Sequence, residues 1–283
     1  MSNIPGTLYI VSTPIGNLGD ISQRAIEILN RVAVIAVEDT RHARRLLEAC
    51  AIRTPTMAVH EHNEREQVAG IVSRLSEGQD VALISDAGTP LVSDPGFVLV
   101  REVRSLGYRV SPVPGASALL AALSVAGMPT DRFVFEGFLP NKSGARQHRL
   151  DELKNETRTL VFYEAPHRIL ASLQDMSQIF GAEREAVLAR ELTKTFETVK
   201  GGSLQSLHDW VAEDPNQQKG EIVMIVHGAS ICDTTVDTET RKLLQILLEE
   251  LPLKQAASLA ARISGNKKNL LYNFAIKELG VGD

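Results

Sequence analysis

The chain has 283 residues, of which 43% are hydrophobic and 23% charged, and its formal net charge is −5 at pH 7. This composition is typical of a globular protein and excludes a chain that is disordered throughout, because apolar content is high and net charge small. No stretch reaches the roughly 18 apolar residues of a membrane helix, and the N-terminus lacks the features of a secretory signal. The negative charge argues against a protein that coats nucleic acid non-specifically, but it allows a local basic patch for a structured RNA.

The first half of the chain alternates strand-like runs with helical patterns. Strands are expected at residues 7–13, 32–37, 56–59, 81–85 and 109–113. Helices are expected at residues 21–31, 40–49, 64–77 and 96–106. The continuous apolar runs at 32–37 and 81–85 are typical of strands buried on both faces. This alternation predicts an α/β domain over residues 1–114, with a mostly parallel sheet covered by helices.

The second half contains more strands than crossover helices. Strands are expected at residues 133–136, 159–163, 186–189, 198–201 and 221–227. Helices are expected at residues 117–125, 147–155, 167–180 and 204–212. A parallel pair needs a crossover connection, so some of these strands must pair antiparallel. We predict a second α/β domain over residues 115–229.

The last part of the chain is helical. A polar segment at residues 229–240 is expected to be a linker, and helices are expected at residues 243–251, 254–263 and 269–279. This stretch predicts a small helical domain over residues 240–283 and resembles a helix-turn-helix. Two interpretations stay open, a bundle packed on the main body and an auxiliary RNA-binding module.

The number and spacing of the cysteine and histidine residues argue against disulfide bonds and a metal site. Cys50 and Cys232 cannot build a disulfide framework and lie outside any CxxC or zinc spacing. We expect both to be small apolar residues and the protein to be cytoplasmic. His60 and His62, two positions apart, make a poor metal site without further ligands, so no metal is expected.

Three loops rich in glycine, proline and small residues follow predicted strands, at residues 12–20, 85–90 and 112–117. In open α/β sheets ligands bind at the carboxyl ends of the strands, and glycine lets backbone approach a ligand closely. A single such loop is most often a plain turn, but three together favour a ligand site. Neither GxGxxG nor GxxxxGK[ST] occurs in the chain, which argues against a dinucleotide fingerprint and a P-loop.

A set of motifs in a fixed order carries a family resemblance. They are TLYIVSTPIGNLGDIS, AVEDTRHARRLL, ALISDAGTPLVSDPG, VSPVPGASALLAAL, FEGFLP, VFYEAPHRI, ARELTKTFET and GEIVMIVHG. Over residues 6–228 this set resembles the tetrapyrrole methylase superfamily. The stretches EDTRHARRLL and FEGFLPNKSGARQHR are similar to the branch that modifies ribosomal RNA rather than porphyrins.

The resemblance implies a function and partners. It implies two α/β domains with S-adenosylmethionine in the cleft between them, and a homodimer. It also implies 2′-O-methylation of a cytidine in the decoding centre of 16S rRNA, in the small ribosomal subunit. A porphyrin-type methyltransferase and a non-catalytic RNA-binding assembly factor remain as alternatives.

The resemblance also carries over cofactor residues. They are Ile10, Pro14, Asp86, Gly88, Thr89, Pro90, Ala116, Ser117, Tyr163 and His227. Structural alternatives stay open for the polar ones. They are a capping or turn aspartate for Asp86, a helix N-cap for Ser117, a core tyrosine for Tyr163 and a hydrogen-bonded histidine at a sheet end for His227.

Two cationic groups are candidates for RNA contact. Arg41, Arg44 and Arg45 share one helix face, since they are three and four residues apart. Lys142, Arg146 and Arg149 lie in and after a loop. The alternative is a solvated face whose cations pair with neighbouring acids.

Methyl transfer to a ribose hydroxyl depends mainly on the correct positioning of the two reactants. A base that takes the proton of the hydroxyl accelerates it further. The candidate bases are Glu38, Asp39, His42, Glu191 and Lys194. Each of them could instead serve only in an ion pair, and the sequence does not decide between them.

Overall fold

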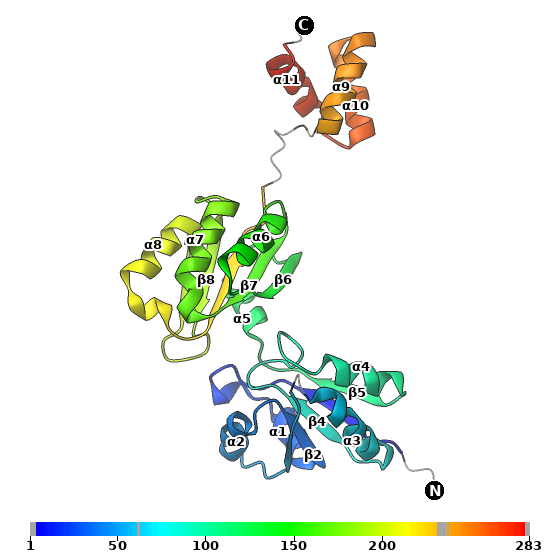
Figure 1. The fold of residues 1–283 in the computed structure, drawn as a ribbon, viewed down its shortest axis with the longest axis vertical. Coiled ribbons are helices and arrows are strands. Elements are labelled where there is room, and N and C mark those ends of the chain that lie inside the picture. Colours follow the sequence, from blue (N-terminus) through cyan, green and yellow to red (C-terminus); the bar gives the residue numbers. More distant parts are fainter. Residues whose placement is uncertain (1–3, 61–62, 231–235, 237, 281–283) are drawn as a thin grey trace. The chain divides into compact units, whose positions relative to one another are not determined.

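The computed structural model describes residues 4–60, 63–230, 236 and 238–280 (Figure 1). The chain forms two compact units, residues 1–229 and 230–283. Cys232 and His62, which entered the sequence analysis, lie outside the described residues.

The first sheet is fully parallel, with strand order β3-β2-β4-β1-β5. Its strands are β1 (Thr7–Val11), β2 (Val34–Val37), β3 (Thr56–Ala58), β4 (Val81–Ile84) and β5 (Arg109–Val113). The connecting helices are η1 (Leu18–Asp20), α1 (Gln23–Arg31), α2 (Thr40–Ala49), α3 (Glu64–Ser76) and α4 (Phe97–Ser105). Every residue of β2 and β4 is buried, as their continuous apolar runs predict.

Local chemistry sets where these helices begin. The hydroxyl of Ser22 accepts a hydrogen bond from the N–H of Ala25 and caps α1. Asp39 caps α2 in the same way, with its carboxylate on the N–H of Arg41. Because Asp39 comes two residues after the end of β2, this cap places the start of α2 at the carboxyl end of the sheet.

The second sheet is mixed, with strand order β6-β7-β10-β8-β9. Its strands are β6 (Phe133–Phe138), β7 (Thr159–Glu164), β8 (Glu185–Arg190), β9 (Thr198–Ser203) and β10 (Ile222–Val226). Its helices are α5 (Ala118–Val125), α6 (Ser143–Leu153), η2 (Pro166–Arg168), α7 (Ile169–Phe180), α8 (Leu204–Glu213) and η3 (Pro215–Gln218). Only β6 and β7 pair in parallel, so the expected antiparallel pairings are confirmed.

Helix α6 begins before the expected start at residue 147. It buries Arg146, Leu150 and Leu153 on one side. The apolar pattern shows only the two leucines, because the first buried residue on that side is an arginine. The sequence pattern therefore missed the first turn.

The two faces of the second sheet have separate cores. On one face, Phe162, Leu173 and Met224 belong to a large cluster with residues of α6, α7 and α8. On the other face, Val161 and Val223 pack with residues of α5 and with Ile15 of the loop after β1. Ile15 is thus a direct contact between the first half of the larger unit and the second sheet.

The smaller unit holds three helices, α9 (Thr238–Glu250), α10 (Leu253–Ser264) and α11 (Lys268–Glu278). They enclose their own apolar core, which includes Leu244, Leu253 and Leu271. Helix α10 ends at Gly265, whose φ of +76° is in the left-handed region that favours glycine. In the described part of the chain, no helix has both the length and the apolar character to cross a membrane.

Glu64 stabilises the start of α4. Its side chain is buried, and its Oε1 accepts the N–H of Leu99 at 2.7 Å, while the N-cap residue Gly96 has no side chain to do so. We expect Glu64→Ala to lower the free energy of unfolding by about 1–3 kcal/mol, because a buried N–H loses its acceptor. Urea unfolding measures this change. The exposed neighbour Glu66 is the matched control, and Glu66→Ala should change stability by less than ~0.5 kcal/mol; equal effects of the two variants would contradict the role of Glu64.

Candidate functional site

A pocket of about 400 Å³ lies in the larger unit, a size in the range of small-molecule sites. Loops after β1, β4, β5, β7 and β8 and the start of β10 contribute to its wall. The lining residues are Ile15, Asp86, Ala87, Gly88, Thr89, Val92, Ser93, Asp94, Ser117, Ala118, Phe138, Tyr163, Glu164, Ala165, Pro166, Ala189, Leu192, Glu221, Ile222 and Val223. The pocket therefore lies at the carboxyl ends of the strands of the first sheet, where ligands bind in open α/β folds.

Hydrogen bonds tie the three loops of the first sheet together. Thr13 and Gly88 exchange backbone hydrogen bonds of 2.8 and 3.1 Å. The hydroxyls of Ser12 and Thr89 are 2.9 Å apart, and that of Thr89 also donates to the carbonyl of Ala116 at 3.1 Å. Gly88 has a φ of +80°, so a side chain there would strain the loop. The loops form one preorganised rim rather than three separate turns.

Backbone strain is concentrated beside this rim. Leu91 and Ser93 after β4 have φ values of +73° and +66°, and Glu191 and Thr193 after β8 have +51° and +66°. Non-glycine residues in this region cost about 1–3 kcal/mol each and gather at functional sites. The strain supports the assignment of the pocket as a binding site.

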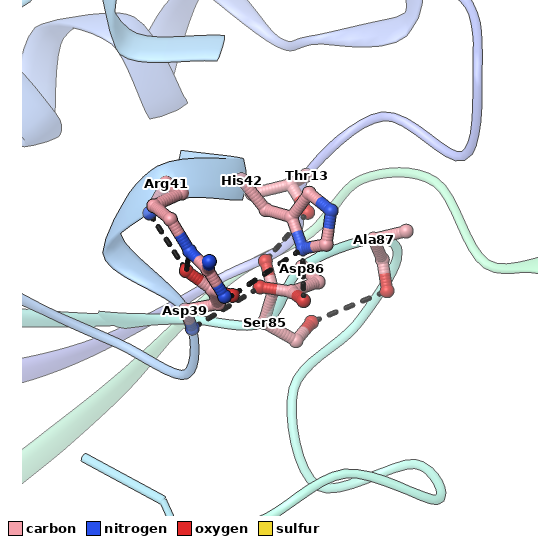
Figure 2. Close-up of polar contacts among 7 residues, drawn as sticks. All are labelled: Thr13, Asp39, Arg41, His42, Ser85, Asp86 and Ala87. Carbon is pink, nitrogen blue, oxygen red and sulfur yellow. Dashed lines mark hydrogen bonds and ion pairs between the residues drawn. The ribbon is translucent and has the colours of Figure 1, made fainter. Parts of the chain in front are cut away.

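The carboxylate of Asp86 connects the pocket to the start of α2 (Figure 2). Its Oδ1 accepts the backbone N–H of Asp39 at 3.3 Å, and its Oδ2 lies 3.0 Å from Nδ1 of His42. Arg41 instead turns to Asp39, 2.9 Å away, as Figure 2 shows. The side chain that contacts the carboxylate of Asp86 is therefore His42 and not Arg41.

The pocket is acidic. Burial, together with the negative charges of Glu38 and Asp86, raises the pKa of Asp94 to about 6. Burial also raises the pKa of Glu38, together with the charges of Asp86 and Asp39. A cationic ligand relieves this repulsion. Asp94 lies in the SDPG segment that continues the loop at residues 85–90, but it was not among the predicted site residues; its closeness to Asp86 in the same motif was the available signal.

Tyr163 combines both interpretations offered for it. It lines the pocket, and its hydroxyl accepts the N–H of Leu119 at 3.2 Å in the first turn of α5. Its ring packs edge-on against Phe135 and Phe138, with centroids 4.8 and 5.6 Å away. Burial raises the pKa of its hydroxyl. The ring of Tyr163 therefore forms an apolar part of the pocket wall, and its hydroxyl is already engaged in a hydrogen bond to the protein.

Five of the residues proposed for the cofactor line the pocket: Asp86, Gly88, Thr89, Ser117 and Tyr163. Ala116 touches this rim through its carbonyl, whereas Pro14 and Pro90 are not among the lining residues. Ser117 precedes α5 but makes no capping hydrogen bond, so its hydroxyl remains available to a ligand. Ile10 packs instead against the core beneath α3 and α4.

The structure places His227 away from the pocket. Strand β10 runs antiparallel to β7, so Ile222 pairs with Glu164 at the pocket and Val226 pairs with Leu160 at the opposite end. His227 follows that far end, with its N–H on the carbonyl of Glu185 and Nδ1 2.9 Å from the oxygen of Gly228. The pocket is therefore lined by the first residues of β10, from Glu221, and not by the residue after its last one, as the sequence had suggested.

The six cations differ in their surroundings. Arg146 is buried against Asp175 at 2.6 Å, which corrects its assignment to RNA, since a buried guanidinium cannot meet a phosphate. Arg149 binds Glu136 and Glu152, and Arg44 binds Glu48, each at 2.6 Å. Arg45 and Lys142 are exposed, and neither forms an ion pair within the described ranges.

Three of the five candidate bases are held in ion pairs. Hydrogen bonds from the side chain and backbone of Arg41 lower the pKa of Asp39 to about 2. Lys194 binds Glu191 at 2.8 Å and Glu221 at 3.2 Å. Glu38 and His42 remain as candidate bases, and His42 lies 3.0 Å from the carboxylate of Asp86. Within the described residues, no three His, Cys, Asp or Glu side chains are grouped to hold a metal ion.

The first comparison defines the class. A family model described as tetrapyrrole (corrin/porphyrin) methylases matches residues 7–208, and one described as the RsmI C-terminal HTH domain matches residues 234–280. Cobalt precorrin-4 methyltransferase has a similar fold, with a TM-score of 0.59 and 14% identity over 78% of this chain and 94% of that one. Uroporphyrin-III C-methyltransferase from Thermus thermophilus, solved with S-adenosyl homocysteine, has a TM-score of 0.53 and 16% identity over 78% and 97%. The class is thus that of the S-adenosylmethionine-dependent methyltransferases of the tetrapyrrole methylase fold, which confirms the expected fold and cofactor.

Relatives narrow the family. The chain is 59% identical to a protein of Pseudomonas aeruginosa named ribosomal RNA small subunit methyltransferase I, over 97% of this chain and 98% of that one. Proteins of the same name from Haemophilus influenzae and Escherichia coli O157:H7 are each 51% identical, over 99% and 98% of this chain and 99% and 97% of theirs. The chain belongs to the ribosomal RNA small subunit methyltransferase I family, within the tetrapyrrole methylases.

Proposed function

We propose that the protein transfers a methyl group from S-adenosylmethionine to the ribose 2′-oxygen of a cytidine in the decoding centre of 16S rRNA. The small ribosomal subunit is the proposed substrate, and the cytoplasm the proposed location. The observation that carries the methyltransferase site is the acidic, preorganised pocket at the carboxyl ends of β1, β4 and β5. The family carries the assignment to ribosomal RNA.

The pocket residues fit the cofactor. S-adenosylmethionine supplies a methyl group on a cationic sulfonium and also carries an ammonium and a carboxylate. Asp86 and Asp94 would hold the cationic part, and Ser117 with the N-terminus of α5 the carboxylate. Tyr163 and the apolar start of β10 would enclose the adenine. We propose that residues 1–114 and 115–229 are the two domains that form these walls.

The exposed side of α2 supports RNA contact. The helix begins beside Asp86, and it carries Arg41, Arg44 and Arg45 on its exposed side. Arg41 and Arg44 each pair with an acid but keep 89% and 76% of their side-chain surface exposed. Phosphate contacts of this kind position RNA on a protein without reading sequence.

Transfer of tritiated methyl groups tests the proposed function. We expect label in 30S subunits, on a ribose that resists alkaline hydrolysis at one cytidine. Free 16S rRNA and a porphyrin precursor are the comparison substrates. Label in the porphyrin alone would refute the proposal, and failure to bind the cofactor in calorimetry would favour a non-catalytic assembly factor.

Arg45→Ala tests the RNA face. We expect weaker binding to subunits and a salt dependence whose slope falls by about one, because one phosphate contact is lost. Cofactor affinity should not change. Arg109 is the matched control, since it is exposed at the amino end of β5, the end opposite the pocket. Filter binding at several salt concentrations measures both variants, and equal slopes for them would remove Arg45 from the proposed face.

A homodimer is also proposed. Edge strand β6 exposes Phe133 and Phe138, and α5 exposes Leu120 and Val125, with exposed fractions from 38% to 59%. Large exposed apolar side chains on an edge strand and on a helix are typical of an interaction surface. Light scattering of the full chain should give twice the monomer mass of 30.9 kDa.

A further inference from the structure

His42 stands apart from the other candidate bases because of its partners. Asp39 is neutralised by Arg41, and Glu191 and Lys194 bind each other. A carboxylate that is hydrogen-bonded to a cation gains little from taking a proton, and an ammonium group held by two carboxylates has no lone pair to accept one, so these three are poor choices. His42 instead faces a carboxylate and keeps 63% of its side chain exposed.

The contact with Asp86 defines the state of the imidazole ring. Nδ1 of His42 lies 3.0 Å from Oδ2 of Asp86, and a carboxylate can only accept there, so Nδ1 carries the proton. Nε2 is then the free lone pair of the neutral ring. A histidine oriented by an aspartate in this way is the arrangement that activates hydroxyl groups in hydrolases.

Asp86 is itself held in place. The backbone N–H of Asp39 donates to its Oδ1, and the loop around it is fixed by the paired backbones of Thr13 and Gly88. The same carboxylate lines the pocket. The ring of His42 is therefore one hydrogen bond away from the wall of the proposed cofactor pocket, on the helix that carries the exposed arginines.

We propose that His42 is the general base for the accepting ribose hydroxyl, with Asp86 as the residue that positions it; this rests on the proposed function. Nε2 takes the hydroxyl proton while the ribose oxygen forms its bond to the methyl carbon. The carbon–sulfur bond breaks, its electron pair stays on sulfur, and the imidazolium later releases the proton to water. The charged groups around the ring are Asp86 from the loop after β4, at 3.0 Å, and Asp39, the N-cap of α2, at 4.0 Å, while Arg41 and Arg45 lie on the same helix.

The test compares His42→Gln with His148→Gln. His148 is also an exposed histidine beside a carboxylate, 3.5 Å from Glu152, but it lies on α6, and Glu152, unlike Asp86, lines no part of the pocket. For His42→Gln we expect kcat on 30S subunits, measured with saturating cofactor, to fall ~10²–10⁴-fold and the acidic limb of its pH profile to disappear. Cofactor affinity in calorimetry and subunit binding should stay within about twofold of the unmodified chain. His148→Gln should change none of these quantities.

A spectroscopic measurement is independent of turnover. Nitrogen-15 NMR of the ligand-free chain should show His42 protonated on Nδ1, and Asp86→Asn should shift that tautomer. Unchanged kcat in His42→Gln, or protonation on Nε2, would overturn the inference. So would loss of the acidic limb in Glu38→Gln alone. A wild-type chain that methylates no subunits would instead refute the proposed function, so the two failures are distinguishable.

Discussion

Arg146→Ala is expected to lower the free energy of unfolding of the larger unit by about 3–5 kcal/mol, because it leaves a buried carboxylate without its cation. Arg146 and Asp175 are 2.6 Å apart, and their side chains are 5% and 6% exposed. Gln147 donates to the second oxygen of Asp175 at 2.8 Å. One amide cannot compensate for the lost charge. Urea unfolding followed by circular dichroism measures the change.

Lys154→Ala is the matched control for this prediction. Lys154 directly follows the same helix and pairs with Asp151 at 2.8 Å, but 47% and 63% of the two side chains are exposed. Exposed pairs contribute about 0–1 kcal/mol, so this variant should be nearly neutral. A loss below 1 kcal/mol in Arg146→Ala would show that the buried pair is dispensable. Because Arg146 is buried, we also expect the cofactor affinity of the variant to stay unchanged under conditions where it remains folded.

The second large effect is a pH dependence of cofactor binding. The pKa of Asp94 is raised to about 6 in the free protein, first by burial and then by Glu38 and Asp86. A cationic ligand favours the ionised carboxylate, so its affinity is complete above about pH 6 and falls as protons compete below it. We expect the affinity for S-adenosylmethionine to be about tenfold weaker at pH 5 than at pH 7. Calorimetry across this range measures it.

Asp94→Asn isolates the responsible group. The variant should bind the cofactor more weakly at pH 7 and lose most of the dependence between pH 5 and 7. Asp131→Asn, at an exposed position between α5 and β6, should behave like the unmodified chain. A steep pH dependence that survives in Asp94→Asn would assign the titration to another pocket group.

Stability should respond in the opposite direction. Since the folded-state pKa of Asp94 lies above its ordinary value of 3.8, ionisation of the carboxyl opposes folding as the pH rises from about 4 to about 6. Removing that charge should therefore make the ligand-free Asp94→Asn chain slightly more stable at pH 7. Binding lost together with stability gained is the signature of a carboxylate held for its ligand rather than for the fold.

Local patterns in the sequence predicted most of the fold. The apolar runs that became β2 and β4 and the βα alternation around them required a buried parallel sheet. The excess of strands after residue 130 required antiparallel pairing. Both features depend on neighbours in the chain, so periodicity is enough to find them.

The site was less predictable. Asp86 and Gly88 stand in a glycine-proline loop whose chemistry is visible in the sequence, and both line the pocket. Arg146 and His227 were misplaced, because the first has a buried partner 29 residues away and the second lies on a strand whose direction depends on its neighbours. Asp94 was missed, since its raised pKa comes from residues brought together by the fold.

The amino-acid sequence alone was enough to predict the class of fold, the three loops that contribute to the pocket and, through its ordered motifs, the family and cofactor. Only the tertiary structure decided which charged groups are paired and which are free. His42 and Asp86 are 44 positions apart, and nothing local relates them. Burial and long-range contact set the charge, the tautomer and the pKa of a side chain, and these are properties of its surroundings rather than of its residue type.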